Sequence, residues 1–144
     1  MPIVADFYQK ITKQASTVLQ HDLIDVVRTK MSERDPIYRS VYVVDQNNKL
    51  LGIITLREIL KVLAIRKGVS GNRSLSRGKL LDYISQGTPA GDVMKAPISV
   101  RKTNTLEEAL ELMVRHDIEE IPVVDAQGKV IGDLNAFELV REME

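Results

Sequence analysis

Residues 41–63 read VYVVDQNNKLLGIITLREILKVL, and residues 121–143 read IPVVDAQGKVIGDLNAFELVREM. The two stretches align without a gap at an offset of 80 residues. Six identities support the alignment: Val43, Val44, Asp45, Lys49, Gly52 and Glu58 match Val123, Val124, Asp125, Lys129, Gly132 and Glu138. Self-similarity at a fixed spacing is the signature of a repeated structural unit. The chain is therefore predicted to contain one unit twice.

Two blocks further upstream extend the repeat. Residues 5–8, ADFY, are similar to residues 91–94, GDVM, at an offset of 86. Three apolar residues of the first copy align with three of the second at an offset of 83, pairing Leu23, Val26 and Val27 with Leu106, Ala109 and Leu110. The same features thus occur twice in the same order.

Each copy predicts the same secondary structure. In the second copy Thr105 begins a helix whose apolar stripe is formed by Leu106, Ala109, Leu110 and Met113. Runs rich in β-branched residues, separated by turns with Asp, Asn and Gly, predict hairpins. The predicted strands are 16–19, 41–45 and 50–54, then 98–100, 121–125 and 130–134, and helices follow the hairpins at 56–65 and 136–143. The unit is β-α-β-β-α and the fold class is α+β, with two copies packed sheet against sheet.

Composition excludes several classes of function. The 144 residues carry 20 Lys and Arg against 20 Asp and Glu, and this balance argues against nucleic-acid binding. Without cysteine there is no disulfide, thiolate nucleophile or Cys-ligated zinc, and two distant histidines do not predict a metal site. No apolar run is long enough to span a membrane and no secretory signal is visible, so we expect a cytoplasmic protein. The motifs GxSxG, HExxH and GxGxxG are absent, and we expect no catalytic activity.

The layout resembles a tandem pair of CBS domains, the regulatory modules named after cystathionine β-synthase. The resemblance covers roughly residues 4–143 and rests on residues 91–94, on Thr105 with its helix, on residues 121–125, and on residues 52–59, GIITLREI. It implies a pseudo-two-fold pair with two clefts between the repeats. It also implies a homodimer, an adenosine ligand such as AMP, ADP or ATP, and regulation of a partner protein.

The resemblance divides the chain into a first repeat at 4–66, a linker at 67–90 and a second repeat at 91–144. The stretch 66–79 reads RKGVSGNRSLSRGK and contains five positive charges without an acidic residue. Its glycine spacing does not fit a phosphate-binding P-loop. A solvated loop and a basic flap near a ligand phosphate or RNA both remain open for it. A short helix is predicted at 79–86, before the second repeat.

The ligand signature of the family is Gly, two apolar residues, Thr or Ser, two residues, then Asp. The first copy has Thr55 and Glu58 at the last two positions, and the second has Asn135 and Glu138. A carboxylate there can accept hydrogen bonds from ribose hydroxyls, and a hydroxyl at a helix start can bind a phosphate oxygen. The same spacing is also a helix capping box, so these residues have a structural interpretation as well.

Other residues complete the predicted ligand sites. Val41, Tyr42, Ile121 and Pro122 are candidates for the walls around an adenine ring. Arg39 precedes the first hairpin and could neutralise a phosphate. At the corresponding place the second copy has Glu119 and Glu120, which would repel one if they face the cleft. We therefore expect phosphorylated ligands to prefer the cleft of the first copy.

Taken together, the sequence predicts a stand-alone, non-catalytic sensor that binds an adenine nucleotide between its repeats and signals to a partner protein through a change in orientation. The alternative is a structural interaction dimer whose clefts are vestigial. No catalytic cofactor and no metal are expected.

Overall fold

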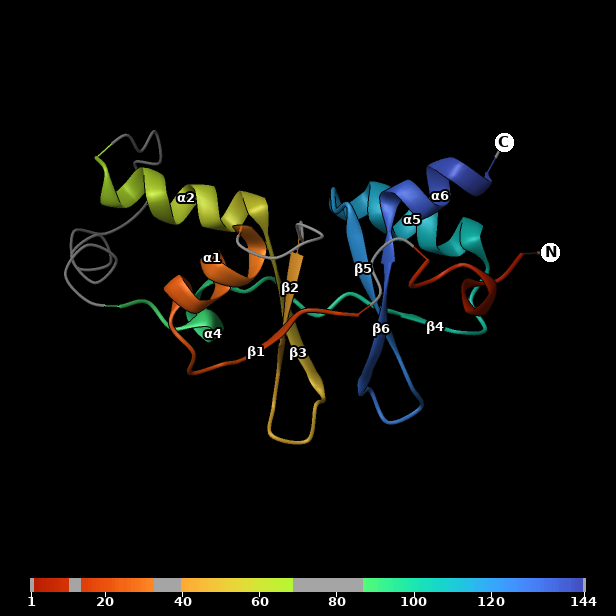
Figure 1. Cartoon of the computed structure of the whole chain (residues 1–144), viewed down its shortest axis with the longest axis horizontal. Coiled ribbons are helices and arrows are strands. Elements are labelled where there is room, and N and C mark those ends of the chain that lie inside the picture. The colour runs from red at the N-terminus through yellow and green to blue at the C-terminus, as the bar shows by residue number, and fades with distance from the viewer. Residues whose placement is uncertain (1, 11–13, 33–39, 69–86, 144) are drawn as a thin grey trace.

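The structure is a computed structural model that describes residues 2–10, 14–32, 40–68 and 87–143. Two three-stranded sheets stand face to face, each with its helices on the outer side (Figure 1). The first unit consists of β1 (Thr17–Leu19), α1 (Ile24–Ser32), β2 (Ser40–Val44), β3 (Leu50–Thr55) and α2 (Leu56–Arg66). The second consists of β4 (Val100–Arg101), α5 (Leu106–His116), β5 (Glu120–Val124), β6 (Val130–Asn135) and α6 (Ala136–Glu142). Two short helical turns, η1 (Val4–Asp6) and α4 (Ala90–Val93), precede the units.

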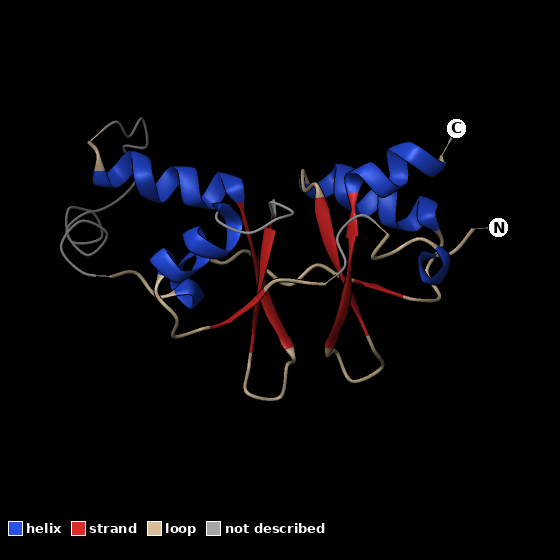
Figure 2. Cartoon of the chain, viewed as in Figure 1, coloured by secondary structure: helices blue, strands red, loops and turns tan. Residues whose placement is uncertain are grey.

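Both sheets have one topology, which confirms the predicted β-α-β-β-α repeat and the α+β fold class. The first strand of each pairs in parallel with the second, and the second pairs antiparallel with the third (Figure 2). Each hairpin also has an irregularity in its pairing at the same place: the register shifts between Val43 and Val44 in the first and between Val123 and Val124 in the second.

Asp45 and Asp125 fix the two hairpin turns in the same way. The Oδ1 atom of Asp45 accepts the backbone N–H groups of Asn47 and Lys49 at 2.8 and 3.0 Å, and Asp125 accepts two such groups at 2.9 Å. These backbone hydrogen bonds lower the pKa of both carboxyl groups. Asn48 and Gly128 occupy the left-handed position of each turn, at φ 66° and 81°, and Asn and Gly are the residues that best tolerate it.

The first helix of the first repeat differs from the sequence prediction by one residue. Leu23 and Val26, predicted for its apolar stripe, are 46% and 41% exposed, whereas Ile24, Val27 and Met31 are buried. In the second repeat Leu106, Ala109 and Met113 are buried and Leu110 is partly exposed. The structural offset between the two helices is therefore 82, since Ile24 and Leu106 open them, and not the predicted 83.

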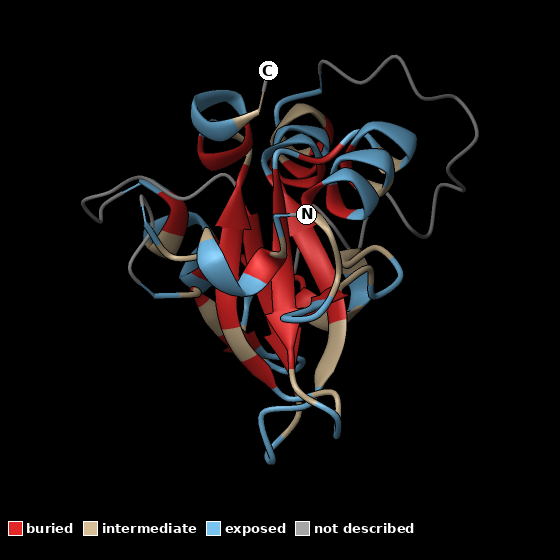
Figure 3. Ribbon diagram, turned by 90° about the vertical axis from the view of Figure 1, so that its right-hand side faces the viewer, coloured by how far each residue is buried: buried red, intermediate tan, exposed pale blue. Residues whose placement is uncertain are grey.

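The inner faces of the two sheets pack on each other and form a seam, as predicted. The apolar cluster of the seam has three buried residues from the first sheet and two from the second: Tyr42, Val44, Ile53, Val124 and Val130. Figure 3 shows the buried strands at the centre of the molecule with exposed turns and helix surfaces around them. At the hairpin ends the seam is joined by backbone hydrogen bonds from Leu50 to Gly128 and from Val130 to Asn48, both 3.0 Å long.

A hydrogen bond between two buried side chains also crosses this seam. The Tyr42 hydroxyl, fully buried, donates a hydrogen bond to Oδ1 of buried Asp133. Burial raises the pKa of Tyr42 well above its ordinary value, and the carboxylates of Asp133 and Glu120 add to the effect. The phenol therefore stays protonated and remains a donor. In the other repeat Pro122 takes the place of Tyr42, and Ile53 takes the place of Asp133. The pseudo-symmetry of the two units therefore does not generate a second pair of this kind.

The segments that lead into the repeats are exchanged between the units. Val4 of η1 belongs to the core of the second unit, and its backbone N–H donates to the Asn104 carbonyl at 2.8 Å. Ala90 of α4 belongs to the core of the first unit, and its N–H donates to the Asp22 carbonyl at 2.7 Å. Each unit is therefore completed by residues that precede the other repeat in the chain.

Most of the basic stretch 66–79 and the helix predicted at 79–86 lie outside the described residues, as does Arg39. Those predictions stay open.

Neighbouring valines of α1 test the corrected helix register. Val27→Ala should lower the free energy of unfolding by about 2 kcal/mol, because it leaves a cavity in the first core. Val26→Ala, the matched control, should change it by less than about 0.5 kcal/mol. Chemical denaturation measures both, and equal effects of the two substitutions would contradict this register.

Removal of the seam hydrogen bond should destabilise the fold. Tyr42→Phe leaves the buried Asp133 without one donor, which should cost about 1–3 kcal/mol in urea denaturation. The double variant Tyr42→Phe/Asp133→Ile places apolar groups on both sides and should recover part of the loss. A Tyr42→Phe protein as stable as the wild type would show that the contact contributes nothing.

Candidate functional site

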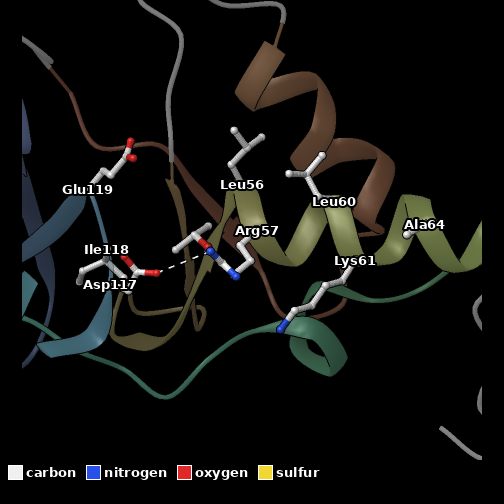
Figure 4. A pocket seen from close by; sticks show the side chains of 9 residues that line it. Leu56, Arg57, Leu60, Lys61, Ala64, Asp117, Ile118 and Glu119 are labelled. Atoms are coloured by element: carbon white, nitrogen blue, oxygen red, sulfur yellow. Dashed lines mark ion pairs between the residues drawn. The ribbon is translucent and has the colours of Figure 1, made fainter. Parts of the chain in front are cut away.

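A cavity of about 540 Å³ lies between α2 and the turn that leads into β5. It is within the size range of small-molecule sites. The first repeat contributes the start and outer face of α2, and the second contributes the turn, so both repeats build the cavity (Figure 4). Its lining residues are Thr55, Leu56, Arg57, Leu60, Lys61, Ala64, Asp117, Ile118 and Glu119.

The lining of the cavity combines apolar and charged side chains. Leu56 and Leu60 are about half exposed and give the cavity an apolar wall. Arg57 forms an ion pair with Asp117, with 3.7 Å between Nη2 and Oδ2 (Figure 4). Both partners are largely exposed, so the pair adds little stability and a ligand can compete for either charge. Lys61 adds a second cation on the same helix face.

Thr55 and Glu58 form a capping box at the start of α2. The backbone N–H and the hydroxyl of Thr55 both donate to Oε1 of Glu58, at 2.8 and 2.7 Å. Thr55 lines the cavity, whereas Glu58 lies one hydrogen bond behind it and is buried. The structural interpretation of the motif is therefore present in the structure, and Thr55 also lines the cavity.

The second copy of the motif caps α6. Asn135 accepts the backbone N–H of Phe137 at 2.8 Å, and its own N–H donates to Oε1 of Glu138 at 2.7 Å. Oε2 of Glu138 accepts the backbone N–H of Lys10. This carboxylate is 1% exposed. Neither Asn135 nor Glu138 lines the cavity at α2.

The four residues expected to wall an adenine ring lie elsewhere. Val41 and Ile121 are buried in the cores of their units, and Tyr42 lies in the seam. Pro122 is buried on β5. None of them lines the cavity at α2. Strand alternation was the signal that could have shown this, because neighbours such as Val41 and Tyr42 must point to opposite faces of a sheet.

The turn of the second repeat lies opposite the Thr55 motif, with Glu119 in the lining. Arg39, which was expected to neutralise a phosphate in this cleft, lies outside the described residues, so that expectation stays a prediction. Glu120, the next residue, is fully buried. Glu119 thus lines the cavity at Thr55, in the cleft of the first copy, which was expected to bind phosphorylated ligands better.

Sequence reasoning missed the residues on the outer face of α2. Arg57, Leu60, Lys61 and Ala64 recur with helical spacing beyond Thr55, and this spacing could have identified a lining face. Among the described residues no group of three or more His, Cys, Asp or Glu is arranged to hold a metal ion. None of the described helices has the length and apolar character needed to cross a bilayer.

Solved structures resemble this fold over nearly its whole length. A CBS domain-containing protein from Thermotoga maritima is 33% identical, with a TM-score of 0.81 and coverage of 96% of this chain and 91% of the other. CBSX2, crystallised in complex with AMP, is 27% identical, with a TM-score of 0.74 and coverage of 98% and 95%.

Among curated relatives, the chloroplastic CBS domain-containing protein CBSX2 of Arabidopsis thaliana is 31% identical over 111 residues, 69% of this chain and 47% of the relative. An inosine-5'-monophosphate dehydrogenase of Thermoplasma acidophilum is 25% identical over 131 residues, 90% of this chain and 22% of the relative. The chain therefore spans less than half the length of both relatives. The sequence model of the CBS domain matches residues 4–65 and 90–144. With this match on both repeats and the duplicated fold, the chain belongs to the CBS domain family, as a tandem pair.

Proposed function

We propose that this CBS pair is a non-catalytic regulatory module that binds an adenine nucleotide of the AMP, ADP or ATP class in the cavity at α2. The observation that carries the proposal is the cavity of about 540 Å³ at the start of α2, lined by Thr55 of the family's ligand motif. The AMP complex of CBSX2, a relative with the same fold, supports an adenosine ligand. The part of the dehydrogenase that this chain matches is about a fifth of that enzyme, and no activity is proposed from it.

The cavity offers a partner for each part of a nucleotide. The first backbone N–H groups of α2 and the Thr55 hydroxyl lie at the positive end of an eleven-residue helix, where a phosphate is stabilised. Arg57 and Lys61 add positive charge on the same side. Leu56 and Leu60 provide apolar surface for the base. Glu58 lies directly behind Thr55 and can accept a ribose hydroxyl once the nucleotide is bound.

Signalling to a partner requires a surface that ligand binding can change. Large apolar side chains are exposed on α2, α5 and α6: Leu56, Leu60, Leu110, Val114, Phe137 and Val140. Two of them, Leu56 and Leu60, also line the cavity. We infer that a second copy of the chain covers this surface and forms a homodimer. Helix α2 would then contact both the ligand and the second copy. An unidentified effector protein would then respond to the dimer, and the expected cytoplasmic location stays a prediction.

The alternative, a structural dimer with a vestigial cleft, is favoured by one observation. The Thr55–Glu58 capping box already uses the hydroxyl and one carboxylate oxygen of the motif. A ligand that binds only the native state must raise the melting temperature, whereas a vestigial cleft predicts no shift. A thermal-shift panel of AMP, ADP, ATP and S-adenosylmethionine therefore separates the two functions.

Substitution of Thr55 separates capping from ligand binding. Thr55→Val removes the hydroxyl, so AMP affinity in titration calorimetry should fall about 10-fold or more. Thr105 is the control, because it also forms a Thr–Glu capping box and lies outside the cavity: its N–H donates to Glu108 at 2.9 Å and its hydroxyl accepts the Glu108 N–H at 3.1 Å. Thr105→Val should cost about 1 kcal/mol of stability and leave AMP affinity unchanged.

AMP binding by Thr55→Val with wild-type affinity would place the ligand away from α2. If no nucleotide of the panel shifts the melting temperature of the wild-type protein, the structural alternative is correct.

A further inference from the structure

The carboxylates of the two ligand motifs use their oxygens differently. At Glu58 both capping donors, the N–H and the hydroxyl of Thr55, end on the same atom, Oε1. At Glu138 donors lie on both oxygens, because the Asn135 N–H donates to Oε1 and the Lys10 N–H donates to Oε2. The motifs are equivalent in sequence but not in their hydrogen bonds.

The second donor comes from the N-terminal segment, which we define as residues 2–10. This segment lies against β6 through several contacts besides the one to Glu138. The Gln9 N–H donates to the Asp133 carbonyl at 2.9 Å. A Cβ added to Gly132 would come within 2.5 Å of the Tyr8 ring, so the ring packs directly on the glycine backbone.

In the first unit the equivalent place on β3 is covered by Met94 and Lys95, and the comparison shows which contact is found only in the second unit. There Met94 packs on Gly52, and Lys95 exchanges two backbone hydrogen bonds with Ile53, of 2.7 and 3.2 Å. Both strands are therefore covered alike by a preceding segment. The bond that the second repeat adds is the one from Lys10 to the motif carboxylate.

We propose that Glu138 anchors the N-terminal segment and does not bind ligand, so that each chain has one adenosine site, the cavity at α2. The inference rests on the proposed function for the site at α2 and extends it to the number of ligands. A ribose could reach Oε2 of Glu138 only by displacing Lys10 from a carboxylate that is almost fully buried. At Glu58 both capping donors end on Oε1, so a ribose hydroxyl that reaches Oε2 leaves the cap intact.

Glutamine substitutions distinguish the two carboxylates. A glutamine side chain has one accepting oxygen and one donating amide group. In Glu58→Gln the single oxygen can still accept both donors from Thr55, so the cap is kept. In Glu138→Gln the N–H groups of Asn135 and Lys10 reach different atoms of the side chain, and one of these atoms becomes the amide nitrogen, which cannot accept. Either the cap or the hydrogen bond to Lys10 is therefore lost.

The experiment combines calorimetry with AMP, thermal melting and hydrogen exchange of the Lys10 amide, on the full chain and both variants. The wild type should bind one AMP per chain. Glu58→Gln should weaken AMP about 10-fold and leave the melting temperature within about 1 °C. Glu138→Gln should keep AMP affinity within about 3-fold, lower the melting temperature by about 5 °C and accelerate exchange at Lys10.

Two AMP molecules per chain, or an equal loss of AMP affinity in both variants, would overturn the inference. So would a Glu138→Gln protein with unchanged melting and unchanged exchange at Lys10. If the wild type binds no AMP, the proposed function fails, while melting and exchange of the two variants still decide whether Glu138 is the anchor.

Discussion

The structure depends on the burial of one sheet face against another. A three-stranded unit with two helices covers only the outer face of its sheet, and the inner face needs a second sheet. Duplication supplies that sheet within the same chain, and the seam of Tyr42, Val44 and Ile53 against Val124 and Val130 is the result. The cavity at α2 exists because the seam holds the turn of one repeat beside the helix of the other. The candidate site is therefore a consequence of how the repeats pack.

Pseudo-symmetry is followed by the backbone and broken by the side chains. Strand registers, turn geometry and bulges repeat closely. The chemistry does not, since the pair Tyr42–Asp133 crosses the seam once, and the motif carboxylates accept different donors. The exchanged leading segments tie each unit to residues that belong to the other repeat in sequence. A change in one unit can thus reach the other through backbone contacts as well as through the seam.

The sequence predicted the repeat, the hairpins and the helices after them, because these elements follow from local periodicity and turn residues. For the first helix of the first repeat it predicted buried Val27 correctly, but it also assigned exposed Leu23 and Val26 to the apolar stripe and omitted buried Ile24. Thr55, one of the candidate site residues from the sequence, lies at the start of α2 and lines the cavity. The sequence could not show that residues 117–119 form the opposite wall of the cavity. Spacing along the chain does not reveal which residues of the second repeat lie beside α2 of the first.

The most direct measurement of the central claim is a titration of isotopically labelled protein with AMP, followed by the chemical shifts of the backbone amides. A nucleotide bound between the repeats should move the signals of Leu56, Arg57 and Ile118 together and in proportion to occupancy, since these residues line the cavity from both repeats. Shifts confined to another surface, or no shifts at millimolar AMP, would contradict a ligand site at α2.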